Sequence, residues 1–283
     1  MGDQRGCRVK AFFIDLSICN GCYCCQVACK DEHCGQDWLP YAKAQPEIGQ
    51  FWLGIDERVR GQVPKVKVTY LPKLCQHCDD APCMAACPVE GAIYKREDGM
   101  VITDPQKCTG CKLCVDVCPT GSIFFNDSLM LAQKCTACSH LRDNDPETWA
   151  DTTRCADACP TGALRFGDEA DFADFIKDAE YLVPEMAGKT RVYYKNLPKK
   201  FVAGTLYDPK QMEIIEGATV TLTDDQSGET FTATTDNYGD FWFNGLKDDR
   251  TFTLVFAKDG KSKTIEGVST AIDLNVGDIA MEL

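Results

Sequence analysis

The chain has 283 residues, enough for two domains, and a formal net charge of −13. Such an acidic protein is unsuited to nucleic-acid binding, which needs a basic face. No uncharged apolar run approaches the roughly 18 residues of a membrane span, and residues 1–6 contain no apolar stretch, so we expect neither a direct membrane span nor an export signal.

The first predicted element, a strand over residues 10–14, leads into a series of closely spaced cysteines. Sixteen of the nineteen cysteines form four groups. The groups are Cys19, Cys22, Cys25 and Cys29; Cys75, Cys78, Cys83 and Cys87; Cys108, Cys111, Cys114 and Cys118; and Cys135, Cys138, Cys155 and Cys159. Groups one and three have the C-x2-C-x2-C-x3-C spacing of bacterial ferredoxins, and four thiolates hold one [4Fe–4S] cluster. The sequence therefore predicts four clusters.

Other uses of these cysteines fit less well. Structural zinc takes two C-x2-C pairs per ion and has no use for a third cysteine three residues later. A disulfide framework would belong to a secreted protein. The remaining Cys7, Cys24 and Cys34 are predicted to be unligated. The histidines near the groups are expected to be packed residues or hydrogen-bond donors, because no group lacks a ligand; they are His33, His77 and His140.

A repeated unit follows the cysteine groups. Residues 92–95 and 100–102 flank Asp98-Gly99 and predict a β-hairpin. Residues 122–125 and 129–131 predict a second hairpin, and a third copy begins at residues 163–166. The insertion at 30–74 is rich in aromatic residues, which indicates an apolar cover over the clusters or, alternatively, a docking surface for a partner.

The last third of the chain has a different pattern. Residues 168–182 place Phe172, Phe175, Ile176 and Ala179 at helical spacing, which predicts an amphipathic helix. From residue 199 onward, turn residues separate short apolar or alternating runs, which predicts a small β-sandwich. The predicted strands are 201–207, 218–222, 230–235, 240–243, 251–256 and 263–265.

The predicted fold class is therefore α+β, with a duplicated ferredoxin-like iron–sulfur domain followed by a small all-β sandwich. We divide the chain into a four-cluster domain at 1–167, a helix and linker at 168–198, and a β-sandwich at 199–283. No nucleophile–base pair or phosphate-binding glycine loop stands out, so no active site of its own is expected. The β-sandwich is predicted to dock on a partner or, alternatively, to bind carbohydrate or another surface.

The four groups in this order resemble the electron-transfer subunits of the DMSO-reductase family of molybdopterin oxidoreductases, over roughly residues 8–167. The resemblance implies four ligand sets. Set A is Cys19, Cys22, Cys25 and Cys159; set B is Cys29, Cys135, Cys138 and Cys155; set C is Cys75, Cys78, Cys83 and Cys118; and set D is Cys87, Cys108, Cys111 and Cys114. It also implies that set A lies toward a large molybdopterin catalytic subunit.

A narrower resemblance rests on the rest of the chain. Residues 191–197, followed by a carboxypeptidase-regulatory-like domain, resemble the small subunits of pyrogallol–phloroglucinol transhydroxylase and of the catechol dehydroxylases of anaerobes. This implies a heterodimer whose large subunit carries molybdenum on two pterin guanine dinucleotides and acts on phenolic aromatics. The transhydroxylase type has an incomplete third cysteine group, whereas all four cysteines are present here. The complete group favours a reductive dehydroxylase.

These expectations leave alternatives open. The chain could belong to a molybdopterin reductase with another acceptor, or could be a free-standing polyferredoxin. Its electron donor would be a soluble protein or an additional anchor subunit. A cytoplasmic location is expected, with export to the periplasm alongside a signal-bearing partner as the alternative.

Overall fold

The computed structural model describes residues 8–283, so the predictions for residues 1–6 and for Cys7 lie outside the described residues. The chain forms two compact units. One contains residues 8–57 and 70–197, and the other contains residues 58–69 and 198–283. Among the described helices, none has the length and apolar character needed to cross a membrane.

A three-stranded sheet forms the middle of the first unit. Strand β1 (Lys10–Asp15) pairs antiparallel with β8 (Leu164–Asp168) and parallel with β9 (Val192–Lys195). Both faces of β1 are buried, because Phe12 and Ile14 enter one apolar cluster while Ala11 and Phe13 enter another. This explains why the predicted strand reads as a continuous apolar run rather than an alternating one.

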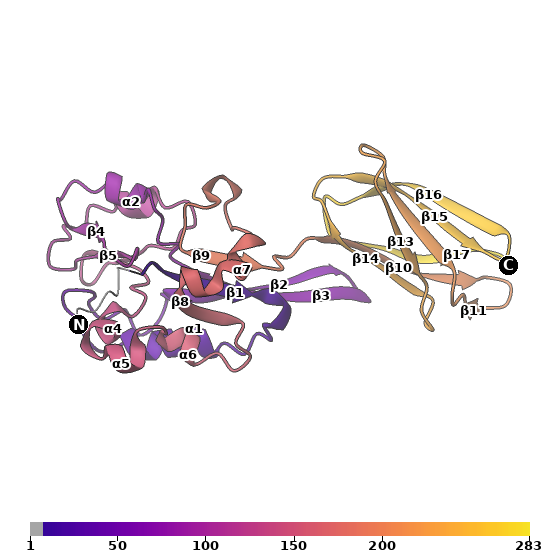
Figure 1. Ribbon diagram of the computed structural model, residues 1–283. Coiled ribbons are helices and arrows are strands. Elements are labelled where there is room, and N and C mark those ends of the chain that lie inside the picture. Colours follow the sequence, from indigo (N-terminus) through magenta and orange to yellow (C-terminus); the bar gives the residue numbers. More distant parts are fainter. Residues whose placement is uncertain (1–7) are drawn as a thin grey trace. The chain divides into compact units, whose positions relative to one another are not determined.

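Short helices and hairpins surround this sheet. In Figure 1, α2 (Pro82–Ala85) lies above the sheet, and β4 (Ile93–Lys95) and β5 (Val101–Thr103) lie to its left. Below it lie α1 (Cys24–His33), α4 (Ser139–Asn144), α5 (Pro146–Trp149) and α6 (Arg154–Asp157). The other short elements are η1 (Leu16–Ile18), α3 (Leu113–Asp116), β6 (Phe124–Asn126), β7 (Leu131–Gln133) and η3 (Pro184–Met186).

The repeated unit that the sequence predicts is present with two differences. β4 pairs with β5 as expected, and β6 pairs with β7, but the second hairpin begins two residues later than predicted. The third copy does not close into a hairpin, because β8 joins β1 instead.

The predicted helix at 168–182 is shorter than expected. It consists of the 3-10 turn η2 (Glu169–Phe172) and α7 (Ala173–Lys177). Its apolar side chains nevertheless pack as the spacing predicts, since Phe172 and Phe175 both contact the Phe13 ring.

The aromatic insertion contains a long β-hairpin that the sequence did not predict. β2 (Leu53–Gln62) pairs with β3 (Lys65–Leu74). At the base of the hairpin, Trp52 is buried and belongs to the main core of the first unit, whereas Phe51 is partly exposed.

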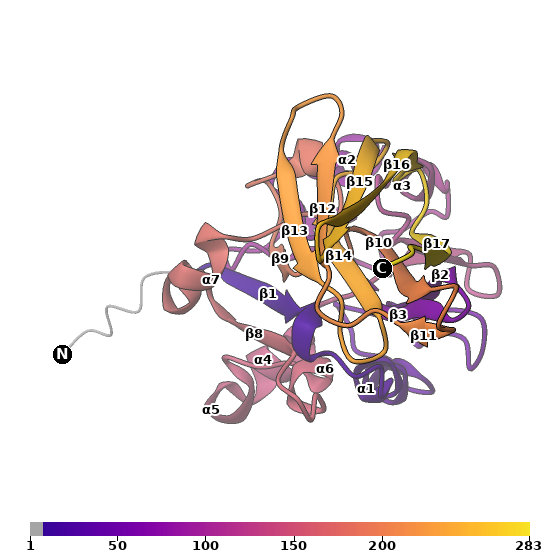
Figure 2. The same cartoon turned by 90° about the vertical axis from the view of Figure 1, so that its right-hand side faces the viewer.

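The second unit contains two four-stranded sheets. One is built on β10 (Lys200–Asp208), which pairs with β11 (Glu213–Ile214), β14 (Asp240–Leu246) and β17 (Leu274–Ala280). The other has the order β13 (Thr230–Thr234), β12 (Thr219–Asp224), β15 (Thr251–Lys258) and β16 (Lys261–Ser269). Figure 2 shows these strands face-on. Alternate residues such as Val220, Leu222 and Phe256 fill the core between the sheets, as in a β-sandwich.

Residues 58–69, the tip of the β2–β3 hairpin, pack with this sandwich. Arg60 forms an ion pair with Asp273 at 2.6 Å, and Lys67 lies 5.0 Å from the centre of the Trp242 ring. The side-chain amide of Gln62 adds hydrogen bonds to the backbone of Asp273 and Asn275. The compact units therefore differ from the predicted division in two respects: residues 58–69 group with the C-terminal domain, and residues 168–197 belong to the first unit.

Candidate metal centres

Each cysteine group opens with a loop that turns through a left-handed backbone. In all four loops the residue before the second cysteine has a positive φ: 68° at Gly21, 45° at His77, 72° at Gly110 and 51° at Ala137. Glycine adopts this conformation without strain, whereas histidine and alanine do so at a cost. The positive φ recurs in all four groups, including the two in which the residue is not glycine. We therefore infer that this loop shape is needed to point the first two thiols of each group toward a common centre.

Sets C and D each surround a cavity. The four set C thiols, from Cys75, Cys78, Cys83 and Cys118, line one cavity. The four set D thiols, from Cys87, Cys108, Cys111 and Cys114, line another. In both cavities three cysteines come from one group and the fourth from the other, so the two groups are interleaved.

The thiols of sets A and B lie close enough to one another for their charges to raise each other's pKa. Burial raises the pKa of Cys25 to about 12, and the charges of Cys159, Cys19 and Cys22 also raise it. Burial likewise raises the pKa of Cys29 well above its usual value, with contributions from Cys135 and Cys138. Cys155 is surrounded by Cys138, Cys29 and Cys135 in the same way. At sets C and D, the fold thus brings together the cysteines that the family resemblance groups, and the cysteines of sets A and B lie near one another.

The sets form a linear series. Cys25 of set A and Cys29 of set B both lie on α1, and the charge of Cys25 raises the pKa of Cys29. Cys75 of set C acts on Cys135 of set B, and Cys83 of set C acts on Cys114 of set D. The order is therefore A, B, C and D. Cys22 in set A and Cys111 in set D are exposed, whereas all four set B thiols are buried, so the series runs between two accessible ends.

Hydrogen bonds to sulfur support the fourth ligand of sets A and C. Cys118 Sγ accepts from the Ser122 amide at 3.3 Å, and Cys159 Sγ accepts from the Leu164 amide at 3.4 Å. Both cysteines open the sequence C-P-T-G, and the threonine hydroxyl lies 3.7 or 3.8 Å from the sulfur. The sequence analysis did not single out these donors, although the repeated C-P-T-G could have indicated them. Such donors tune the reduction potential of a cluster.

The four sets fit a multi-atom cluster better than a single ion. Within residues 8–283, no three His, Cys, Asp or Glu side chains converge closely enough to hold one metal ion. Instead, at sets C and D, four thiols surround a common cavity. A tetrahedral zinc site needs its four sulfurs about 2.3 Å from one point, whereas a [4Fe–4S] cube needs one sulfur at each of four corners. The arrangement therefore fits the cube.

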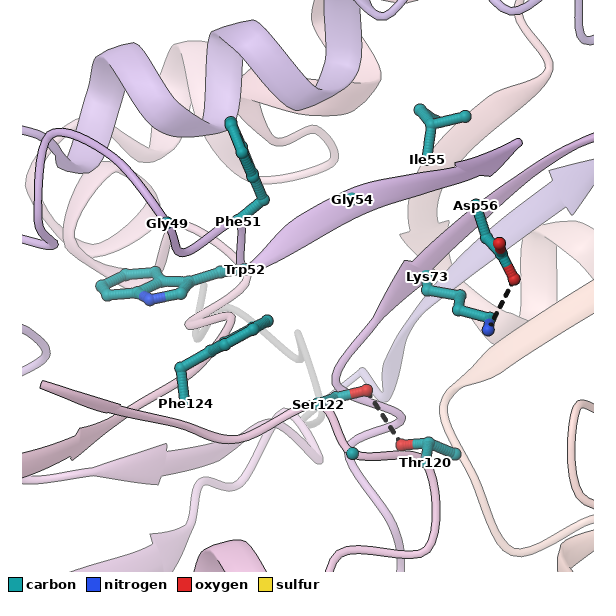
Figure 3. Close-up of a pocket in the computed structure, with 11 residues that line it drawn as sticks. Gly49, Phe51, Trp52, Gly54, Ile55, Asp56, Lys73, Thr120, Ser122 and Phe124 are labelled. Atoms are coloured by element: carbon teal, nitrogen blue, oxygen red, sulfur yellow. Dashed lines mark hydrogen bonds and ion pairs between the residues drawn. The ribbon is translucent and has the colours of Figure 1, made fainter. Parts of the chain in front are cut away.

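A pocket of about 270 Å³ lies beside the loop that follows Cys118 (Figure 3). Phe51, Trp52 and Phe124 form its apolar part. Its polar edge carries the 2.8 Å ion pair between Lys73 and Asp56. Thr120 and Ser122, which are hydrogen-bonded to each other, line the pocket from the Cys118 loop. The aromatic insertion thus contributes both a buried residue, Trp52, and the wall of an open pocket near set C.

The three histidines are buried and packed near the cysteine sets. His140 stacks on Trp38 and donates a hydrogen bond through Nε2 to the Glu32 carboxylate at 2.9 Å. His33 packs between His140 and Trp52. His77 accepts a hydrogen bond from the Val101 amide through Nδ1. Two of the remaining cysteines lie outside the sets: Cys24 is exposed beside Cys22, and Cys34 follows the end of α1.

Acidification is expected to destabilise the fold through His33. Burial, with a smaller contribution from His140, lowers the pKa of His33 to about 3, whereas an unfolded chain protonates it near 6.5. Between these values the unfolded state binds the extra proton, so the free energy of unfolding falls as pH drops below 6.5, by about 2 kcal/mol at pH 5. Urea unfolding at pH 7 and pH 5 should show a smaller pH difference for His33→Phe. An identical difference in both proteins would contradict this.

Comparison with known proteins identifies a relative along most of the chain. The chain is 39% identical over 260 residues to the pyrogallol hydroxytransferase small subunit of Pelobacter acidigallici, covering 88% of this chain and 90% of that protein. The chain belongs to this family of small subunits. Residues 66–169 match the 4Fe-4S dicluster domain family, and residues 202–282 match the carboxypeptidase regulatory-like domain family.

Other relatives match less than half of the chain. A tetrathionate reductase subunit of Salmonella typhimurium is 38% identical over 46% of this chain and 48% of its own length. A subunit of the anaerobic dimethyl sulfoxide reductase of Escherichia coli is 38% identical over 45% of this chain and 60% of its own length. These matches confirm the predicted family resemblance, the iron–sulfur cofactor and the two-part fold class.

Proposed function

We propose that this chain is the electron-transfer subunit of a molybdenum oxidoreductase, in which sets A to D hold four [4Fe–4S] clusters. The observation that carries the proposal is the linear series of four cysteine sets between an exposed Cys22 and an exposed Cys111. A bound [4Fe–4S] cluster takes up and releases one electron at a time. The protein residues hold the clusters, bury the middle ones and donate hydrogen bonds to their sulfurs.

We assign the two ends of the series to two partners. Set A is proposed to face a large catalytic subunit that carries the molybdenum cofactor, as the family resemblance implies. Set D would then receive electrons from a soluble donor or an anchor subunit. Exposed apolar residues in and around α3, including Leu113 and Val117, support this second assignment, because such residues are common at protein interfaces.

The substrate class proposed for the partner is a phenolic aromatic. The relative over most of the chain is a pyrogallol hydroxytransferase small subunit, which supports this class. The complete Cys108–Cys118 group supports a reaction that consumes electrons, and therefore a reductive dehydroxylase rather than a transhydroxylase. We propose a cytoplasmic location, with co-export by a signal-bearing partner as the alternative.

The proposal is tested on the natively purified complex. We expect co-elution with a larger molybdenum-containing chain, about sixteen iron atoms per small subunit, and substrate-dependent oxidation of a reduced dye during loss of a phenolic hydroxyl. Elution of the small subunit alone would favour a polyferredoxin. Hydroxyl transfer without dye oxidation would favour a transhydroxylase, and zinc in place of iron would contradict the cluster assignment.

A further inference from the structure

Lys134 lies where sets B and C meet. It directly precedes Cys135 at the end of β7, and only 2% of its surface is exposed. Its ammonium donates to the carbonyl oxygen of Val101 and, at 3.2 Å, to that of Cys135. Val101 belongs to β5 and also holds His77 of the second cysteine group through its amide. Lys134 is therefore anchored to backbone on both sides of the junction.

The environment of Lys134 differs from that of two other cations near the cysteines, the buried Arg142 and the partly exposed Arg154. Arg142 pairs with Asp98 at 2.8 Å, and Arg154 pairs with Glu32 at 3.1 Å, so carboxylates balance their charges. The Lys134 ammonium donates to two neutral carbonyl oxygens. These accept hydrogen bonds but do not neutralise its positive charge.

This charge lies beside both middle sets. Val101, whose carbonyl oxygen accepts from the ammonium, lines the set C cavity, and Cys135, whose carbonyl oxygen also accepts, belongs to set B. A fixed positive charge stabilises any negative charge that develops next to it. Burial strengthens the effect, because solvent and salt screen buried charges less than exposed ones.

We propose that Lys134 raises the reduction potentials of the two middle clusters, those held by sets B and C, and so favours residence of the electron in the interior of the series. The inference rests on the proposed function, because it requires clusters in these sets. Reduction adds one negative charge to a cluster, and a nearby fixed positive charge stabilises the reduced form more than the oxidised form.

The repeat supplies a matched control. Lys107 precedes Cys108 as Lys134 precedes Cys135, but the Lys107 side chain is 55% exposed and lies 3.7 Å from the Asp104 carboxylate. Its charge is therefore screened by water and by its partner. Lys134→Gln removes the buried charge while retaining a hydrogen-bond donor, and Lys107→Gln removes the exposed one. Lys134→Arg retains the positive charge.

The experiment is an EPR-monitored redox titration of the purified holo-complex, with iron measured on the same samples and the set C signal assigned from Cys78→Ala. For Lys134→Gln we expect lower midpoint potentials for the set B and C clusters and unchanged potentials for the outer two. Lys107→Gln should match the wild type, and Lys134→Arg should keep the middle potentials above those of Lys134→Gln.

The remaining outcomes distinguish a failure of the proposed function from a failure of the role proposed for Lys134. Fewer than four one-electron centres in the wild type would overturn the proposed function itself. Four centres with unchanged middle potentials in Lys134→Gln would overturn only the role of Lys134, as would an equal shift of all four. Loss of iron from Lys134→Gln and Lys134→Met, with retention in Lys107→Gln, would also overturn it, because it would make Lys134 a residue needed to hold the clusters.

Discussion

Cys78→Ala is expected to interrupt electron flow through the middle of the series. Cys78 lines the set C cavity, and set C lies between set B and set D. Alanine cannot ligate iron, so the iron content should fall from about sixteen to about twelve atoms per chain. Reduction of the catalytic partner by dye should fall by more than about a hundred-fold, because losing even an outer-shell partner of a metal site costs 10–100-fold.

The position of the break can be measured directly. In rapid mixing with a reductant that enters at set D, the set D cluster of the Cys78→Ala protein should still be reduced while sets A and B stay oxidised. Cys24→Ser is the control, because Cys24 is exposed and lies outside the four sets. Loss of iron from Cys24→Ser together with full activity of Cys78→Ala would contradict both the ligand assignment and the order of the sets.

Spacing in the sequence predicts which cysteines belong to a metal site, because the chemistry of a cluster constrains that spacing. The partition into sets follows from family resemblance, and at sets C and D the fold brings the grouped cysteines together through interleaved loops. Lys134 was not predicted, because its importance depends on burial between Val101 and Cys135, and a lysine before a cysteine also occurs at the exposed Lys107.

The β2–β3 hairpin shows where pattern reading failed. A strand is recognised from sequence by one buried face, but along this hairpin Val59, Val66 and Val68 are exposed, as is Val63 at its turn. The valines that alternate with lysines in residues 65–68 therefore do not form a buried face of the strand. The β-sandwich strands were predicted well, because their alternate residues do enter a core between two sheets. The missed hairpin matters, since its tip belongs to the same compact unit as the sandwich.

Arg60→Ala is expected to destabilise that unit by about 3–5 kcal/mol, the usual cost of removing one partner of a buried ion pair. The side chains of Arg60 and Asp273 are 14% and 9% exposed, and the guanidinium contacts both carboxylate oxygens, at 2.9 and 2.6 Å. Asp273 also accepts from the Phe201 amide at 3.1 Å, at the start of β10. Removing Arg60 would leave the Asp273 charge buried with backbone donors alone.

Segment-resolved hydrogen exchange on the intact protein measures this effect, because it reports opening of residues 199–283 separately from the cluster domain. The control is Lys210→Ala in the same unit. Lys210 pairs with Glu282 at 2.7 Å, but both side chains are more than half exposed, so its removal is expected to change exchange little. A double-mutant cycle with Asp273→Asn isolates the coupling between the two residues.

The outcome also decides how a deletion of the sandwich should be interpreted. Equal exchange in Arg60→Ala and Lys210→Ala would mean that the hairpin tip does not stabilise the sandwich, and a deletion of residues 199–283 would then report on the sandwich alone. If the costs differ as expected, that deletion also removes the contacts of residues 58–69. Point variants on the sandwich surface then become the sounder test of docking, because they leave the hairpin tip and its ion pair in place.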